Sequence, residues 1–423
     1  MAPRAESFRP AAAGRCGRKG IMRRSTRPSD AADLHAFVQA HTDDLRAYLF
    51  ELIRARTENP PGDEFRAARV LTAFCERHAI PHQTFEKQPG RTNVVARIGG
   101  GRLRILVPLH FDTVPAGEGW KTDPFEPVEA DGRIYGRGAM DDKGPLAAMM
   151  LAARYLKAHE ADLPGEFILV GAADEESGSE LGMEYLLAEC GLEADAAIVP
   201  DAGYGMRRID VGEKGVLFLK VRAVGRQAHG SEPERGSSAL WPMVDFLNRI
   251  RSWRPPSPAS DLFTPPTLNV GAIHAGTVPN MVPGRCEVLL DVRYLPGGDG
   301  EAMVAYLQQV LGQVEAASGG VRMDLEVLSH QAPTLLAADL PLVDVLERRT
   351  EALTGIRPKR SGQSGATVAK ALILHGIPAV GFTCGPEGIM HQADEWISLE
   401  ELAQFVEVMT QVVLDLLGGA PNA

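Results

Sequence analysis

From about residue 30 the chain alternates apolar, strand-like runs with helical runs, and this rhythm constrains the fold more than any other feature. Four short runs have the composition of buried strands: "TNVVARIG", "RLRILVPLHF", "GEFILVGAA" and "ADAAIVPDA". Helical periodicity lies between and around them, for example in "GPLAAMMLAARYLKAH". Strands that alternate with helices predict an α/β fold with a mostly parallel sheet covered by helices.

The rhythm changes over residues 208–328. There the expected order is β-α-β-β-α-β, which is the ferredoxin-like arrangement. We therefore expect a discontinuous first domain, 30–207 and 329–423, with a smaller α+β domain inserted between its two parts. A cleft between two domains is a common place for a ligand site.

Residues 1–29 form a basic extension with eight Lys or Arg side chains and one acid, Glu6. The extension lacks the apolar segment of a secretory signal. We interpret it as disordered, or as the product of a start placed too early, with Met22 as the true start; a targeting peptide is the alternative. Because the whole chain has a net charge of −11, the remainder is more acidic still. An acidic body argues against nucleic-acid binding.

Cysteine usage and hydropathy indicate the cellular compartment of the protein. No apolar run reaches the roughly 18 residues of a membrane-spanning helix. The five cysteines are odd in number, widely spaced and without a C-x-x-C pair. This favours buried thiols in a reducing compartment over disulfides or a thiolate metal site. These features predict a cytoplasmic protein with no membrane partner.

Histidine and carboxylate side chains gather just after the expected strands. They are His110 and Asp112, then Asp141 and Asp142, the run Asp174, Glu175 and Glu176, then Asp201 and, far downstream, His391. The carboxyl ends of strands in an open α/β sheet form the edge where ligands bind. Singly, each residue has an ordinary explanation, such as an interior histidine, a helix N-cap or a turn. Together they predict one site at this edge.

Their chemistry favours a metal site. Histidine and carboxylate ligands without cysteine suit zinc or a similar divalent ion. There are too many carboxylates for one tetrahedral zinc, but enough for two ions that share a bridging carboxylate, a common hydrolytic arrangement. His110 and Asp112 point to the same side of an extended chain. Asp112 could then accept the second ring N–H of His110.

Seven motifs together resemble one family. They are "HFDTVP", "GRGAMDDKGPLAA", "DEESGS", "QAHGS", "GTVPNMVPG", "DVRYLPG" and "HQADEW", in the expected order between about residues 35 and 418. The chain resembles the metallopeptidase family of aminoacylase, acetylornithine deacetylase, succinyl-diaminopimelate desuccinylase, glutamate carboxypeptidase and bacterial dipeptidases. The resemblance implies a phosphorylase/hydrolase-like catalytic domain with an inserted lid and dimerisation domain.

The resemblance also implies two divalent metal ions, zinc first, with cobalt or manganese as alternatives. Asp141 would bridge the two ions, and the peptide bond that follows it would be cis. Glu176 would complete the site that holds His110. Asp201 would complete the other site, with His391.

Further roles follow from the same resemblance. Glu175 would be the general base, and Asp112 would orient His110. His229 would reach across a homodimer to stabilise the oxyanion, although a loop histidine without function is the plain alternative. Asn280 and Arg293 would contact the carboxylate end of the substrate, although Arg293 could instead form a structural ion pair.

The chain departs from the family pattern in one segment. Val368 stands where the family usually has an aspartate after the threonine, which puts in doubt one contact to the substrate or to a metal-binding side chain, but not the metals themselves. Ser364 and Gly365 are weak candidates for lining the substrate pocket. Asp174 receives no metal role, and we interpret it as an acceptor for nearby backbone N–H groups.

The substrate is the least determined property. "MDDKGP" and "PDAGYG" resemble the dipeptidase branch of the family, and the aspartate at 201 resembles its aminopeptidase-like members, which implies hydrolysis of dipeptides or other small peptides. An N-acyl-amino-acid deacylase is the alternative, and a catalytically silent binding protein on the same scaffold is a third hypothesis. The inserted domain lacks the insertion with which some monomeric dipeptidases of the family imitate a dimer, so the resemblance implies a homodimer.

Overall fold

The structure, a computed structural model, describes residues 31–337 and 339–418. The predicted basic extension therefore lies outside the described residues. The helices are α1 Ala31–Ala40, α2 Thr42–Arg54, α3 Phe65–Arg77, α4 Lys143–Ala158, α5 Met183–Ala188, α6 Leu240–Ile250, α7 Gly300–Ala317, α8 Pro341–Thr354, α9 Val368–Leu374 and α10 Leu399–Leu417. Short 3-10 turns are η1 Glu160–Asp162, η2 Glu175–Ser177 and η3 Pro233–Arg235. Within the described ranges no helix is both long and apolar enough to cross a membrane.

The strands form three sheets. They are β1 His82–Glu86, β2 Thr92–Gly99, β3 Arg104–His110, β4 Val128–Ala130, β5 Arg133–Tyr135, β6 Glu166–Ala172, β7 Ala196–Val199, β8 Arg208–Glu213, β9 Gly215–Val224, β10 Thr267–Ala275, β11 Arg285–Tyr294, β12 Arg322–Gln331, β13 Thr334–Leu335, β14 Lys359–Gln363, β15 Ala379–Gly381 and β16 Trp396–Ser398. The largest sheet has the order β1-β2-β6-β3-β7-β15-β8-β13, with β14 also paired to β8. Strands β16, β5 and β4 form a small separate sheet.

The centre of the large sheet is parallel, as expected. Strands β6, β3, β7 and β15 all run in the same direction, and antiparallel strands extend the sheet on both sides. Strand β3 shows why the centre is apolar: Leu106 packs in one core, and Ile105 and Val107 pack in the other. Helices α4 and α10 cover one face and α5 and α9 the other. The α/β expectation is confirmed.

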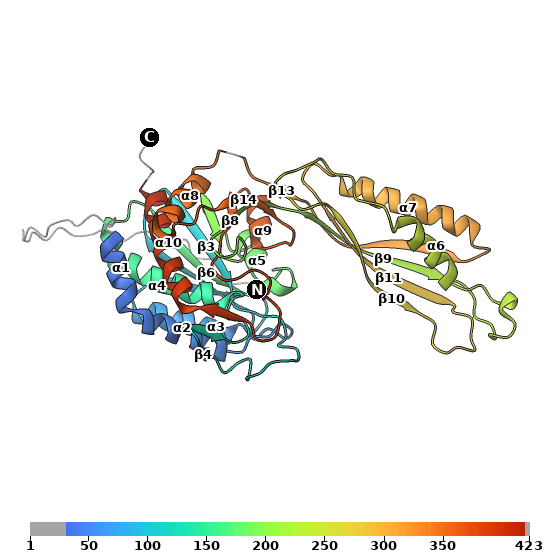
Figure 1. The fold of residues 1–423 in the computed structure, drawn as a ribbon, viewed down its shortest axis with the longest axis horizontal. Coiled ribbons are helices and arrows are strands. Elements are labelled where there is room, and N and C mark those ends of the chain that lie inside the picture. The colour runs from blue at the N-terminus through green and yellow to red at the C-terminus, as the bar shows by residue number, and fades with distance from the viewer. Residues whose placement is uncertain (1–30, 338, 419–423) are drawn as a thin grey trace, which may run out of the picture.

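The second lobe is a four-stranded antiparallel sheet with its own core. Its order is β10-β11-β9-β12, and α6 and α7 pack on one face (Figure 1). This is the ferredoxin-like arrangement expected from the sequence. Strand β8 belongs to the large sheet, however, although the sequence analysis placed residue 208 in the inserted domain. The short polar β8 was missed because its strand character depends on its neighbours β13, β14 and β15.

Candidate metal centre

Four of the predicted site residues lie at or just after the ends of three neighbouring strands at the centre of the large sheet. His110 is the last residue of β3, Glu175 and Glu176 form η2 after β6, and Asp201 follows β7. Strand β3 lies between β6 and β7, and all three are parallel. Their carboxyl ends therefore meet at one edge of the sheet, and the fold brings these side chains together.

Asp141 lies between two histidines. Its Oδ1 is 3.0 Å from Nε2 of His110 and its Oδ2 is 3.1 Å from Nε2 of His391. Asp141 comes from the loop before α4, and His391 comes from the loop between β15 and β16. The peptide bond between Asp141 and Asp142 is cis, as the resemblance implied. One carboxylate that faces two imidazole nitrogens has the geometry of a bridging ligand.

Two overlapping groups of ligand atoms could each hold a cation. The first group is His110, Asp141 and Glu176. The second group is His110, Glu175 and Asp201. Within each group the ligand atoms lie within 4.8 Å of one another. Oε2 of Glu176 also lies 3.3 Å from Nε2 of His391. Glu176 thus faces His391, and Asp201 groups with His110. Glu176 is thus within reach of both histidines, so its expected pairing with His110 stays a prediction, and the contact with His391 offers the opposite pairing.

The electrostatics of the cluster are those of crowded carboxylates. Burial, together with the nearby charge of Asp201, raises the pKa of Glu175 well above its usual range. Burial, with the charge of Asp141, does the same to the pKa of Asp201. Hydrogen bonds to Asp141 and Glu176 raise the pKa of His391 to about 10. Positive charge at this place would relieve the repulsion, so the histidine and carboxylate donors fit divalent cations.

Comparison with known proteins identifies the family. The chain matches the profile of peptidase family M20/M25/M40 over residues 106–415, which is more than half of its length. The chain belongs to this family. All of the residues predicted for the site lie within the matched range.

Three similar proteins bear on the activity. An acetylornithine deacetylase of Myxococcus xanthus is 31% identical over 391 residues, covering 89% of this chain and 98% of the relative. An uncharacterized metallohydrolase of Methanocaldococcus jannaschii is 28% identical over 401 residues, covering 86% and 97%. The solved structure of the dipeptidase Dug1p of Saccharomyces cerevisiae has a TM-score of 0.76 at 14% identity, covering 93% of this chain and 100% of that chain, and shows the fold alone. The chain is therefore a metallohydrolase of the peptidase and deacylase kind.

In this M20 family member, Asp112 supports the turn after β6. Its carboxylate accepts the backbone N–H groups of Glu175 and Glu176, both at 3.1 Å, and the side-chain amide of Asn59 at 2.9 Å. Nδ1 of His110 lies 2.9 Å from the backbone carbonyl of Asp112 and 3.6 Å from its carboxylate. Because a carbonyl only accepts, Nδ1 carries the hydrogen and Nε2 is left to face the cluster. The carbonyl, rather than the expected carboxylate, makes this close contact.

Glu395 is a supporting residue that the sequence analysis did not find. It is buried and accepts backbone N–H groups from Gly138, Met140 and Asp141 at 3.1, 2.8 and 3.0 Å. It also forms an ion pair with the buried Arg137 at 2.6 Å. Glu395 therefore fixes the loop that presents Asp141. The only signal in the sequence was an acid close to His391 in "HQADEW".

Asp174 has the structural role that the sequence suggested. Its Oδ2 accepts the backbone N–H of Leu181 at 3.1 Å. Its Oδ1 accepts from the guanidinium of Arg91 at 2.9 Å, and that guanidinium also binds the buried Glu64 through two hydrogen bonds. Asp174 has a left-handed backbone, with φ of 66°. This turn directs the two following glutamates toward the cluster.

The second lobe holds the remaining predicted residues, at opposite ends of its sheet. Strand β9 begins next to β8, and its ten residues span about 30 Å. His229 lies beyond the far end of β9, where the backbone N–H of Gly230 donates to the carbonyl of Asn280 at 2.8 Å. Arg293 pairs in register with Val216 at the near end. Figure 1 shows β9 leading away from the large sheet, so His229 and Asn280, beyond its far end, are far from the metal cluster of their own chain.

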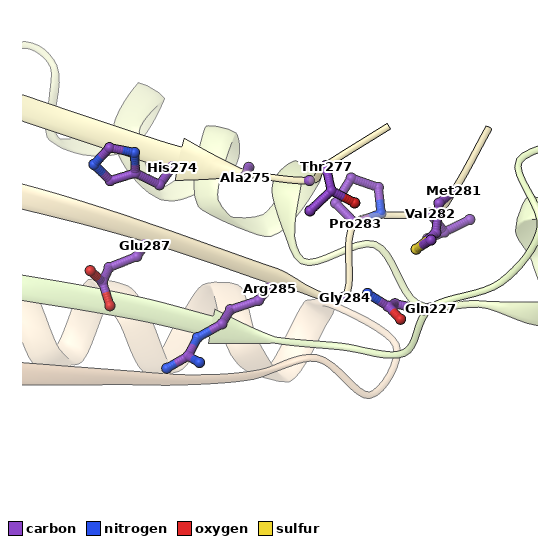
Figure 2. Close-up of a pocket in the computed structure, with 11 residues that line it drawn as sticks. Gln227, His274, Ala275, Thr277, Met281, Val282, Pro283, Gly284, Arg285 and Glu287 are labelled. Carbon is purple, nitrogen blue, oxygen red and sulfur yellow. The ribbon is translucent and has the colours of Figure 1, made fainter. Parts of the chain in front are cut away.

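The far end of this lobe carries a hollow of about 490 Å³ (Figure 2). Met281 lines this hollow, and its backbone pairs with that of His229 in an isolated antiparallel β-bridge. At the near end, Arg293 forms two hydrogen bonds with Asp291, at 2.7 and 3.2 Å. This is the ion pair that the sequence analysis left open as the alternative for Arg293.

The departure at Val368 is accommodated by packing. Val368 begins α9 and is buried in the apolar core against the second face of the large sheet. An apolar residue is therefore compatible with this position. Ser364 is exposed and its hydroxyl contacts that of Thr264 at 2.9 Å, and Gly365 lies beside it in the same loop. Neither is among the groups of ligand atoms described above.

Proposed function

We propose that the chain is a dinuclear metal hydrolase that cleaves the amide bond of a dipeptide or another small peptide. The observation that carries this proposal is the buried carboxylate of Asp141 between His110 and His391. Each end of this arrangement has a further carboxylate within reach. The family supplies the reaction class, and this geometry supports two ions at one site.

We assign the two ions to opposite sides of Asp141. His110 and Asp201 would hold one ion, and His391 and Glu176 would hold the other. Zinc is the metal that we propose, with cobalt or manganese as alternatives, because all three accept these ligands. When bound, such ions lower the pKa of a water molecule and polarise the scissile carbonyl.

Glu175 is proposed as the general base. Burial raises its pKa, which brings the carboxylate toward the range in which a base works best near neutral pH. Glu175 also lines a cavity of about 460 Å³ that is bounded by Thr367 and Lys370 of the large lobe and by His330 at the end of β12. The cavity leaves room for a substrate beside the base. Glu175 would take the proton of the attacking water and pass it to the leaving amine.

Three residues of the second lobe would complete the site in a homodimer. A partner's copy of this lobe would present His229 as the donor to the oxyanion and Asn280 as a contact for the substrate's carboxylate. Arg293, at the near end of its own lobe, would supply a second contact. Its guanidinium would have to exchange Asp291 for the substrate, and a fork of N–H donors suits a carboxylate.

An N-acyl amino acid is the second candidate substrate. The observation that favours it is the 31% identity with an acetylornithine deacetylase over most of both chains. Dipeptides remain the first proposal because of the aspartate at 201 and the "MDDKGP" motif. Both substrates contain an amide bond beside a free carboxylate, so the same groups would act on either.

A substrate panel tests the assignment. The enzyme would be loaded separately with zinc, cobalt and manganese and offered dipeptides, N-acetyl amino acids and N-succinyl amino acids. Release of free amino acids from dipeptides alone supports the first proposal. Turnover of the acylated amino acids alone would replace it with the second. No metal-dependent turnover of any amide would contradict both.

A further inference from the structure

A second hollow lies at the same edge of the large sheet as the metal cluster. It measures about 650 Å³ and lies between the loop after β7, the turn from α8 into β14, and the loop after β15. Strand β15 is parallel to β7 and antiparallel to β8. The start of β8 therefore lies at the edge where Asp201 follows β7. The hollow is separate from the cavity beside Glu175 and shares no lining residue with it.

Four basic side chains line this hollow. They are Arg207, Arg208, Arg357 and Lys359, and Glu387 is the one acid among the lining residues. Such clustering stands out in a chain whose net charge is −11. Lys359 and Arg208 are register partners on adjacent strands. Like charges placed side by side on a sheet repel each other.

The cations are only partly neutralised by the protein. Arg208 lies 3.2 Å from Glu387, and Arg357 is 3.9 Å from Glu351, both at the surface. In the described part of the chain, the side chains of Arg207 and Lys359 have no hydrogen-bond or ion-pair partner. Exposed ion pairs of this kind contribute little interaction free energy. Positive charge therefore remains available to a ligand.

The walls of the hollow also fit a small anion. Gly205, Gly355 and Gly385 line it in left-handed conformations, with φ of 62°, 71° and 85°, and have no side chains to fill it. The ring of Tyr204 forms another wall, with the guanidinium of Arg208 5.4 Å from its centre. A concave basic surface concentrates anions from solution.

We propose that this hollow binds a small anion with two or more negative charges, of the phosphate or dicarboxylate class. Guanidinium and ammonium groups donate charge-assisted hydrogen bonds to such anions. The bound anion would connect the loop after Asp201 with the loop that leads to His391. It would thereby brace two segments that carry proposed metal ligands. The binding step itself does not depend on the proposed hydrolase activity.

Calorimetric titration of the purified protein tests the site, with inorganic phosphate, succinate and, as a monovalent control, acetate. The double variant Arg207→Gln/Lys359→Gln removes two exposed cations from the hollow. The matched control Arg102→Gln/Arg251→Gln removes two exposed cations from the β2–β3 turn and the segment after α6. Thermal unfolding of each variant checks that it is folded.

We expect saturable binding of phosphate, succinate or both that is much tighter than that of acetate. Loss of two charge-assisted hydrogen bonds should weaken it by about tenfold or more in Arg207→Gln/Lys359→Gln. The control variant should bind as the wild type does. The proposal is overturned if neither dianion binds, if the hollow variant binds them unchanged, or if the control variant loses binding equally. Unchanged binding by the hollow variant would place the anion at the metals instead. Equal loss of binding by the control variant would attribute binding to the overall charge of the protein.

Discussion

Asp141 contacts two histidines from distant parts of the chain, and this contact affects the protonation state of His391. Without metal, its carboxylate and that of Glu176 hold a proton on His391, whose pKa is raised to about 10. A histidine side chain that binds a metal must do so as the neutral imidazole. Under the proposed assignment, metal binding below that pH therefore requires His391 to lose its proton.

This predicts proton release on metal binding at pH 7. The folded pKa lies above 7, so His391 is charged in the metal-free protein and neutral in the loaded one. Zinc titrations in two buffers with different ionisation enthalpies measure the protons released. The variant His391→Gln should release about one proton fewer than the wild type. Equal release by both would show that His391 is not protonated before metal binds.

Glu395 carries a second prediction at this scale. Glu395→Ala would leave three backbone N–H groups buried without their acceptor and the buried Arg137 without its carboxylate partner. Breaking such a buried pair costs about 3–5 kcal/mol in unfolding free energy. Denaturant unfolding measures this loss. The control Glu126→Ala removes the exposed partner of Arg54 and should change stability by less than about 0.5 kcal/mol. A similarly small effect at Glu395 would contradict its supporting role.

Sequence reasoning found the residues of the site more readily than their arrangement. His110 and Asp201 follow apolar strands, and that pattern is visible in one sequence. The contact between Glu176 and His391 was not visible, because the backbone is left-handed at Asp174 and His391, with φ of 66° and 63°. Few non-glycine residues adopt this conformation, and sequence patterns do not reveal it.

At the scale of elements, the start of α4 holds the loop of Asp141 in place. A Cβ on Gly144 would lie 2.2 Å from the carbonyl oxygen of Ala139. Gly144→Ala should therefore displace this loop and reduce both stability and metal content. Gly312, in the exposed part of α7, has open space around its Cα. Gly312→Ala should instead stabilise by about 0.5–1 kcal/mol, as alanine does in helices. Thermal unfolding and metal analysis of both variants check this contrast, and metal retained by Gly144→Ala would contradict it.

The elements that sequence predicted are those with strong patterns of their own. Strand β2 was expected over residues 92–99 and has those bounds. Strands β8, β13 and β14 were missed. Strand β14, "KRSGQ", is short and polar, and it is a strand because β8 pairs with it. Pairing of this kind is a tertiary effect that local propensity does not contain.

At the scale of the whole molecule, the length of the second lobe is what motivates the proposal of a homodimer. His229 lies about 30 Å beyond the near end of its sheet, so under this proposal it would serve the cluster of another subunit. A symmetric dimer would give each cluster one partner histidine.

Hybrid dimers test this arrangement. Glu175→Ala and His229→Ala should each be nearly inactive alone. In a mixed dimer, one site combines the intact Glu175 of one subunit with the intact His229 of the other. Random mixing of equal amounts should therefore restore about a quarter of wild-type activity. No gain over the unmixed variants would place His229 outside the partner's site.

The most direct test of the central claim is turnover and metal content measured in the same preparation of Glu175→Gln. This change keeps the shape of the side chain but removes its ability to accept a proton. We predict that turnover falls by a factor of at least about 10² and that metal content stays near two ions per chain. Retained turnover, or loss of metal from this variant, would contradict the account in which Glu175 is the base and Glu176 the ligand.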